Sequence, residues 1–279
     1  MLSISGFGRT GPLKNAVGYA QTVHAFSGLS SITGYVGGRP VDPGNFWGDH
    51  IAALTGAFAL LVALHHRKRT GEGQYIDLSM IEAAISLIPE AIMDYTMNHR
   101  TREPMGNRDD IMAPHGCYRC KGEDKWVTVA VSNDGEWRAF LDAIGNPEWG
   151  TDDRFSDGYK RWKNREELDK LVEQWTVNHT PYEIMGLLQK AGIASGPTLN
   201  AEELLNDPHL RERGFFIEFD HPQIGKGILP RLPWVVDNTP LGCYEPAPLM
   251  GEDNDYVFRH LLGLNKEEMH RLAKERVIY

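Results

Sequence analysis

One acidic residue, Asp49, stands out because a long apolar segment follows it directly. From Ile51 to Leu64 all residues but two are apolar, which predicts a buried helix that begins near Asp49. A carboxylate in the first turn of a helix can accept hydrogen bonds from backbone N–H groups that lack partners within the helix. A carboxylate that is shielded from water can instead act as a nucleophile. Position alone favours the helix cap, so other motifs must decide between the two roles.

Several histidines could supply acid–base chemistry, because imidazole titrates near neutral pH. None has a carboxylate partner at helical spacing, so we interpret them as surface or packing residues. His50 carries slightly more interest because it follows Asp49, although successive helix residues point in different directions. The other histidines considered are His24, His65 and His66.

Two further motifs have the spacing of a cofactor or metal site. The segment Gly6–Gly11 matches the dinucleotide fingerprint, but Pro12 follows at once and no amphipathic helix continues from it. His115, Cys117 and Cys120 have spacing that zinc could use, but no second cysteine pair is present. Strand alternation predicts that Cys117 is buried and that Cys120 faces a hairpin. We therefore expect neither a nucleotide cofactor nor a metal.

Composition limits the classes of partner and compartment. The 279 residues include 41% hydrophobic and 10% aromatic residues, enough for one large or two modest cores. A net charge of -9 disfavours nucleic acid as a partner. Three cysteines indicate a reducing compartment, so we expect a cytoplasmic protein. Neither a signal peptide nor a membrane anchor is recognised, because the apolar stretch 51–64 is short and ends in charges.

Alternating strand and helix patterns surround Asp49 and predict α/β packing. A polar segment at 100–116 is the best candidate for a domain boundary. Thr180 and Pro181 have the residue types of a helix N-cap and first helical position. The expected strands are 1–5, 75–79, a hairpin within 116–132 and turn-broken strands within 215–236; the expected helices are 80–99 with a kink at Pro89, 134–144, 164–178, 180–192, a pair within 201–214 and the segment from 255.

Three segments of the chain together resemble the sequence motifs of a known family. They are SISGFGRTGP at 3–12, GYAQTVHAFSGLSSITGYVGGRPV at 18–41 and WGDHIAALTGAFALLVALHHRKRTGEGQYIDLSMIEAA at 47–84. With them, the chain resembles the class III CoA-transferases, the CaiB/BaiF family, over essentially its whole length. Later segments, MAPHGCYRCKGEDKWVTVAV, AGIASGPTLNAEELLNDPHL and APLMGEDND, continue the resemblance in the expected order.

The resemblance implies a chemistry for Asp49. An aspartate at this position in the family attacks the thioester of an acyl-CoA, forms a mixed anhydride and releases the CoA thiolate. Further anhydride and thioester steps then pass CoA to an acceptor carboxylic acid. No metal or redox cofactor is implied, and coenzyme A is a substrate. The expected small-molecule partners are therefore an acyl-CoA and a carboxylic acid.

Other positions correspond to residues that line the family's CoA site or cover its aspartate. Ser5, Gly6, Phe7 and Gly8 resemble a loop near the pantetheine arm, although some members have Lys and Tyr in place of Ser5 and Phe7. Met80 resembles a residue of the same site. The glycine-rich lid of oxalate-type members has no counterpart here, and our candidates for that loop are Gly106 and Asn107.

Two alternatives to a transferase remain. Acyl-CoA racemases share the fold and carry a histidine after the glycine of the segment that aligns with 18–22. Here that residue is Tyr19, which lacks a pKa suited to proton abstraction near pH 7. A noncatalytic subunit or degenerate fragment that only binds CoA or a partner chain is the other alternative.

Full-length members also have a Rossmann-like N-terminal half that this chain lacks. We therefore expect an α/β fold with an incomplete Rossmann-like large domain, a small α+β domain and an interlocked dimer. The predicted domains are 1–111 for the large-domain part with the CoA site, 112–241 for the small domain, and 242–279 for the return to the large domain. We expect a homodimer, or an assembly with a chain that supplies the missing half.

Overall fold

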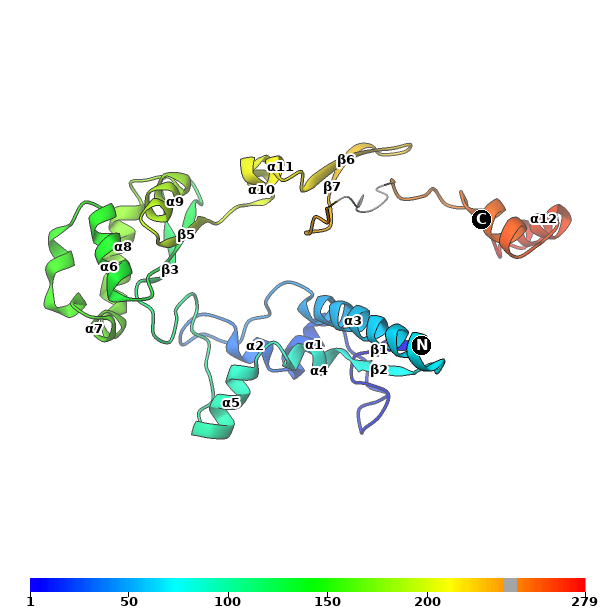
Figure 1. Cartoon of the computed structure of the whole chain (residues 1–279), viewed down its shortest axis with the longest axis horizontal. Helices are drawn as coiled ribbons and strands as arrows, with labels where there is room; N and C mark the ends of the chain where they lie inside the picture. The colour runs from blue at the N-terminus through cyan, green and yellow to red at the C-terminus, as the bar shows by residue number, and fades with distance from the viewer. Residues whose placement is uncertain (238–244, 279) are drawn as a thin grey trace. The chain divides into compact units, whose positions relative to one another are not determined.

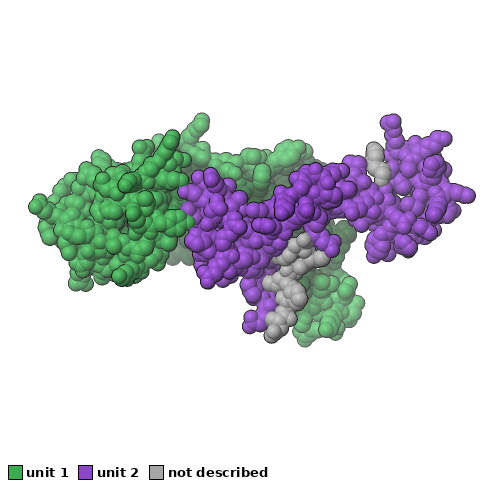
Figure 2. All heavy atoms as spheres, turned by 90° about the horizontal axis from the view of Figure 1, so that it is seen from above, with its two compact units in different colours: residues 1–198 green, residues 199–279 purple. Residues whose placement is uncertain are grey.

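The structure, a computed structural model, describes residues 1–237 and 245–278. The chain forms two compact units, Met1–Thr198 and Leu199–Tyr279 (Figures 1 and 2). The expected boundary between residues 111 and 112 falls inside the first unit, and the one between 241 and 242 lies outside the described residues.

The first part of unit 1 is built on two parallel strands. β1 (Leu2–Ser5) pairs with β2 (Ile76–Ser79) in a register that places Leu2 opposite Ile76. Parallel strands need a long crossover, and three helices make up this one. Figure 1 shows the longest of them, α3, beside the strand pair. The helices of this part are α1 (Ala20–Phe26), α2 (Leu29–Ile32), α3 (Trp47–Thr70), α4 (Met80–Ile85) and α5 (Pro89–Asn98).

The expectation that α3 is buried all round is wrong for this chain. Its buried residues are Gly48, Ala52 and Gly56, whereas Leu54 and Phe58 are 69% and 68% exposed. Neighbouring elements cover only the face that carries the three small residues. The remaining apolar side chains of α3 have no comparable cover within the described chain, which makes this helix a candidate for contact with further protein.

The length of α3 also exceeds the apolar stretch predicted from the sequence. The helix has 24 residues, and its most apolar window of 18 residues has a mean hydropathy of 1.5. By length and composition alone it could cross a membrane, so the expectation that it is too short is wrong. Only 17% of that window is buried, and the covered face is the one that carries the small residues.

Local signals placed most helix ends correctly. Ser79 caps α4, because its hydroxyl accepts a hydrogen bond from the Glu82 amide. Pro89 separates α4 from α5 rather than kinking one continuous helix. Thr180 caps the helix Pro181–Lys190 by accepting from the Glu183 amide, and the Glu183 side chain accepts from the Thr180 amide in return. The Thr180 cap confirms the predicted N-cap, whereas the Ser79 cap was not predicted and the expected kink at Pro89 is wrong.

The second part of unit 1 packs helices against a three-stranded antiparallel sheet of order β3-β4-β5. The outer strand β5 was not predicted, because its four residues include a glycine and a proline. Buried aromatic and aliphatic side chains of the sheet and helices form one core. The elements are β3 (His115–Arg119), β4 (Trp126–Ala130), α6 (Asp134–Ala143), η1 (Glu148–Thr151), η2 (Asp153–Phe155), α7 (Gly158–Lys163), α8 (Arg165–Thr176), α9 (Pro181–Lys190) and β5 (Ala194–Pro197).

The burial of Cys117, in β3, and of Cys120, directly after β3, is the reverse of the prediction. Cys120 is buried and Cys117 is only half-buried. Tyr118 points into the core, so alternation carries the buried face from Tyr118 to Cys120. Burial raises the pKa of the Cys120 thiol to about 11. The thiol therefore stays protonated at neutral pH, which suits a packing role better than a reactive one.

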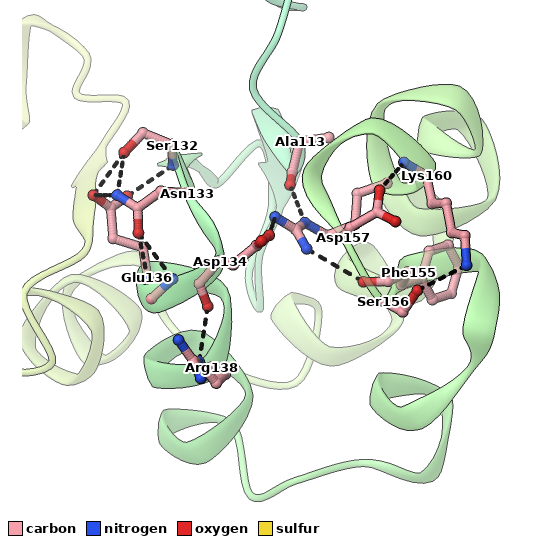
Figure 3. A network of polar contacts seen from close by, with 12 residues as sticks. Ala113, Ser132, Asn133, Asp134, Glu136, Arg138, Phe155, Ser156, Asp157 and Lys160 are labelled. Carbon is pink, nitrogen blue, oxygen red and sulfur yellow. Dashed lines mark hydrogen bonds and ion pairs between the residues drawn. The ribbon is translucent and has the colours of Figure 1, made fainter.

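A buried arginine, Arg161, ties the segment before β3 to the helices, and Figure 3 labels the three residues to which it donates, Ala113, Asp134 and Phe155. Only 1% of this residue is exposed. Its guanidinium donates to the carbonyl oxygens of Ala113 and Phe155, at 3.1 and 3.3 Å, and to a carboxylate oxygen of Asp134 at 2.7 Å. The guanidinium carbon also lies 5.1 Å from the centre of the Trp137 ring. One side chain thus holds three separate segments together.

Unit 2 contains short helices and one strand hairpin. The strands β6 (Phe216–His221) and β7 (Gly225–Pro230) pair in antiparallel register around a turn at 222–224. The predicted helical pair appears as α10 (Ala201–Asn206) and α11 (Pro208–Glu212). The π-helical segment η3 (Asp255–Leu261) and α12 (Lys266–Lys274) confirm the helical character expected from 255 onward.

Candidate active site

Three small residues spaced four apart let α3 approach its neighbours closely. Gly48, Ala52 and Gly56 form its buried face. A Cβ atom added at Gly48 would lie 2.6 Å from Cγ1 of Val23 in α1, closer than any normal contact. Gly56 is one of the two residues that interrupt the apolar stretch 51–64. The spacing of small residues was the sequence signal for which face of α3 is covered.

We expect Gly48→Ala to lower activity on the order of 10²-fold and stability by about 1–3 kcal/mol. Alanine intrinsically favours a helix by about 1 kcal/mol over glycine, so a loss would identify the steric clash with Val23 as the cause. Thermal unfolding tests the loss of stability, and an assay of CoA transfer, the activity that the sequence resemblance implies, tests the loss of activity.

Gly56→Ala is the matched control for Gly48→Ala. Its added Cβ would meet Cδ2 of Leu2 at 3.1 Å, the end of a flexible side chain that can move. The double substitution Gly48→Ala with Val23→Ala should recover much of the loss, because it removes the methyl group in the way. Equal behaviour of the two glycine variants would contradict the importance of close packing at Gly48.

Asp49 is the third residue of α3, and its carboxylate is exposed. No hydrogen bond or ion pair of its side chain is found within the described residues. The helix-cap role that its position favours is therefore not the one adopted. The carboxylate stays free at the positive end of the helix, where backbone dipoles favour negative charge.

Other groups satisfy the first amides of α3. The Phe46 amide donates to the side-chain oxygen of Asn45 at 2.8 Å, and the Trp47 amide donates to the Asn45 carbonyl at 2.9 Å. The Gly48 amide donates to Nε2 of His24 at 3.2 Å. The Gly48 amide has no acceptor within α3, and a histidine of another helix supplies one.

The sequence suggested that His24 is a surface or packing residue, but in the structure its ring makes two polar contacts. It is 1% exposed, and its Nδ1 lies 2.7 Å from a carboxylate oxygen of Asp42. Asp42 belongs to the loop between α2 and α3, so no helical spacing could have paired the two residues. The only sequence signal was the position of His24 beside the buried residues Ala20 and Val23 of α1.

The predicted CoA loop, 5–8, lies against the junction of β2 and α4. The Gly6 carbonyl accepts hydrogen bonds from the Ile81 amide at 3.1 Å and from the Ser79 hydroxyl at 3.4 Å. This brings the loop to Met80, which lies between those two residues. The Ser5 hydroxyl is buried and has no partner within the described chain. Ser5 does not line the cavity next to this loop, so the structure assigns its hydroxyl no contact with that cavity.

A cavity of about 520 Å³ opens beside this loop. Phe7 and Gly8 line it, together with Phe26 of α1, Asp77 and Ser79. The rings of Phe7 and Phe26 meet edge to face, with centres 5.3 Å apart. A mixed apolar and hydrogen-bonding lining of this size suits a small organic group better than a multiply charged one.

The first turn of α3 lies near the same loop. Ile51, which follows Asp49 by two residues, packs in one apolar cluster with Phe7 and Met80. Five of the predicted residues, Asp49, Gly6, Phe7, Gly8 and Met80, thus sit on neighbouring segments of one part of unit 1. Ser5 belongs to the same part through β1.

The lid candidates Gly106 and Asn107 lie at another place in unit 1. The Gly106 amide donates to the Gly34 carbonyl at 2.8 Å, and the Asn107 carbonyl lies 2.8 Å from Nδ1 of His115. Both residues line a cavity of about 340 Å³ that Tyr35 also borders. Within the described residues, no hydrogen bond joins either of them to Asp49.

The geometry gives no support to the two alternative motifs. No helix follows the Gly6–Gly11 segment directly, because α1 begins only at Ala20, so the segment does not lead into a helix N-terminus as the dinucleotide fingerprint does. Cys117 lies 3.6 Å from the Thr198 hydroxyl, and Cys120 contacts the Tyr118 carbonyl. In the described ranges, no three potential ligands are grouped to hold a metal ion.

Comparisons with known proteins agree on one family. The model of CoA-transferase family III matches residues 1–254. A succinyl-CoA–D-citramalate CoA-transferase of Chloroflexus aurantiacus is 33% identical over 282 residues, which cover 100% of this chain and 69% of that protein. The alpha subunit of a succinyl-CoA–L-malate CoA-transferase of Chloroflexus aurantiacus is 33% identical and covers 100% and 65%.

A solved structure gives the same result for the fold. A CAIB/BAIF family protein from Brucella suis superposes with a TM-score of 0.82 at 27% identity, covering 93% of this chain and 67% of that one. The chain therefore spans about two thirds of the length of the proteins that it matches.

Proposed function

The chain belongs to CoA-transferase family III, as its sequence resemblance predicted, and we propose that it transfers CoA from an acyl-CoA thioester to a carboxylic acid through Asp49. The observation that carries this proposal is the free carboxylate of Asp49 in the first turn of α3, a helix whose Ile51 packs in one apolar cluster with Phe7 of the loop 5–8. The Asp49 carboxylate caps no amide, so its oxygen atoms are available for attack, and its exposed position requires the bound substrate or a further polypeptide to shield it from water.

The proposed reaction uses only carboxylates and a thiolate. An Asp49 oxygen attacks the carbonyl carbon of the thioester, the carbon–sulfur bond breaks, and CoA leaves as thiolate with the electron pair. The thiolate then attacks the Asp49 carbonyl carbon of the mixed anhydride, the donor acid leaves, and Asp49 carries CoA as a thioester. The acceptor carboxylate then attacks the Asp49 thioester, and CoA leaves as thiolate from a second mixed anhydride. The thiolate attacks the acceptor's carbonyl carbon in this anhydride, and Asp49 leaves as free carboxylate. Neither a net proton nor an electron is gained or lost.

The positive end of α3 would stabilise the oxyanion of each tetrahedral intermediate. The amides of Phe46, Trp47 and Gly48 already donate to Asn45 and His24, so this stabilisation comes from the helix dipole and is worth about 0.3–1 kcal/mol. The cavity beside Phe7 and Gly8 suits the uncharged pantetheine arm, because the acids Asp77 and Glu82 on its wall would repel phosphates. The adenosine phosphates of CoA would then extend away from this cavity.

We further propose that donor and acceptor are short dicarboxylic acids and that another polypeptide completes the site. The two Chloroflexus proteins act, by their names, on succinyl-CoA with citramalate or malate, and one of them is an alpha subunit. The exposed apolar side chains of α3 need a protein surface to cover them. A second copy of the chain or a separate subunit would supply that surface.

Trapping with hydroxylamine tests the proposed function. The protein should be purified from its native source, so that any partner polypeptide is present, and incubated with succinyl-CoA and hydroxylamine. We expect a hydroxamate on Asp49 in the peptide mass spectrum, since hydroxylamine cleaves anhydrides and thioesters. An unmodified Asp49 would overturn the covalent mechanism.

The same samples separate the two alternatives. A racemase would exchange the α-proton of a 2-methylacyl-CoA for deuterium without forming the hydroxamate. A noncatalytic subunit would bind CoA or its partner chain and show neither reaction. Tyr19, the residue at the racemase histidine position, is largely exposed and offers no imidazole for the exchange.

A further inference from the structure

We propose that His24, held by Asp42, positions the nucleophile Asp49 by serving as the N-terminal cap of α3. The inference rests on the proposed function of Asp49, but its geometry can be measured without any turnover. It concerns a buried histidine of α1, a carboxylate of the loop before α3, and the amide of the residue that precedes Asp49.

The two hydrogen bonds of His24 require one neutral tautomer. Asp42 lies 2.7 Å from Nδ1, and an ionised carboxylate can only accept, so Nδ1 carries the proton. The Gly48 amide points its N–H at Nε2 from 3.2 Å, so Nε2 must offer its lone pair. A doubly protonated ring, or a ring protonated on Nε2, would place two donors face to face. Asp42 therefore selects the form of His24 that can cap the helix.

Burial makes this cap difficult to replace. His24 is 1% exposed, so water has little access to take its place at the Gly48 amide. The N-cap residue itself, Phe46, has a side chain that cannot accept a hydrogen bond. The close contact between Gly48 and Val23 fixes the same turn from its other side. Together these contacts determine where α3 begins.

The cap has a direct consequence for Asp49. Asp49 stands at the N3 position, where an acidic side chain often turns back to the amides of its own helix. Here His24 and Asn45 have taken the preceding amides. The Asp49 carboxylate is left outside the capping network, on a turn whose position is fixed. Asn45 thus occupies the Phe46 amide that Asp49 could otherwise cap, and His24 fixes the turn that carries Asp49 without touching the substrate.

Two substitutions of His24 separate its two hydrogen bonds. His24→Gln places a carbonyl oxygen near the position of Nε2, so it can still accept from Gly48. His24→Asn places an amide near the position of Nδ1, so it can still donate to Asp42 but cannot reach Gly48. We expect His24→Gln to stay within a few-fold of the parent enzyme, and His24→Asn to lose kcat on the order of 10²-fold with KM for the acyl-CoA little changed.

The tautomer supplies a readout that does not depend on activity. In ¹⁵N spectra of the imidazole, we expect His24 protonated on Nδ1 in the parent protein. The Asp42→Asn variant should lose this selection, because its amide can also donate to the ring. The Gly48 amide should exchange with solvent faster in His24→Asn than in His24→Gln, which also shows whether each variant is folded.

The outcomes distinguish this inference from the function on which it rests. An Nε2-protonated His24, or equal kcat values and equal Gly48 exchange in the two variants, would overturn the positioning role. A parent protein with the Nδ1 tautomer and a protected Gly48 amide, but without an Asp49 hydroxamate, would sink the transferase mechanism while supporting the cap.

Discussion

Asp49→Asn is expected to abolish CoA transfer, with a loss on the order of 10⁴-fold or more in kcat. The amide is nearly the same size as the carboxylate but is a poor nucleophile toward a thioester. Because the Asp49 side chain makes no hydrogen bond within the described residues, its removal should leave the fold unchanged. Steady-state assays with succinyl-CoA, together with a thermal unfolding curve, test both expectations.

Two observations would make the result specific to Asp49. The hydroxamate seen in the parent protein should be missing from the peptide that carries the substitution. Asp142→Asn, which changes an exposed carboxylate of α6, is the matched control and should retain full activity. Undiminished turnover in Asp49→Asn would show that the nucleophile has been misassigned.

Arg161→Met is expected to have the largest effect on stability, a loss of about 3–5 kcal/mol. Methionine keeps much of the apolar stem but removes all five donors. The carbonyl oxygens of Ala113 and Phe155 would then be left without their donor, and an unsatisfied buried acceptor costs about 1–3 kcal/mol. The contact with the Trp137 ring is lost as well. Chemical denaturation followed by tryptophan fluorescence measures the change.

Arg138→Met is the control for the loss of an arginine. Arg138 is exposed on α6, and its guanidinium donates to the Asp134 carbonyl at 3.2 Å (Figure 3). Its substitution should change stability by no more than about 0.5 kcal/mol. If both variants unfolded at the same denaturant concentration, the buried network around Arg161 would not be a major support of this part of unit 1.

Local sequence signals predicted elements well where neighbours in the chain decide the structure. Thr180, Pro181 and Glu183 form their cap through bonds that span three residues, so their types and spacing suffice. The sequence predicts a hairpin whose second strand runs from Trp126 to Val131, and the structure has it as Trp126–Ala130. The strand β5 is not predicted, because pairing with β4 stabilises a segment of poor intrinsic propensity. The burial of Cys120 in place of Cys117 shows the same limit, since the face that meets the core is decided across the sheet.

The apolar helix after Asp49 illustrates a second limit. Its composition predicted burial on all sides, yet the described chain covers only the Gly48–Ala52–Gly56 face. Hydrophobicity indicates that a surface needs cover, but it does not indicate which polypeptide provides it. The incomplete cover agrees with a chain that spans about two thirds of the length of its relatives.

The sequence by itself determined the family, the position of Asp49 at the start of a helix and the segments that resemble the CoA site. Only the tertiary structure decided that Asp49 is not the cap of its own helix. That role belongs to His24, which accepts from Gly48, and to its partner Asp42, eighteen residues further along the chain. The physical reason is that a hydrogen bond between separate elements depends on how α1, the following loop and α3 pack, and neither spacing nor propensity encodes that contact.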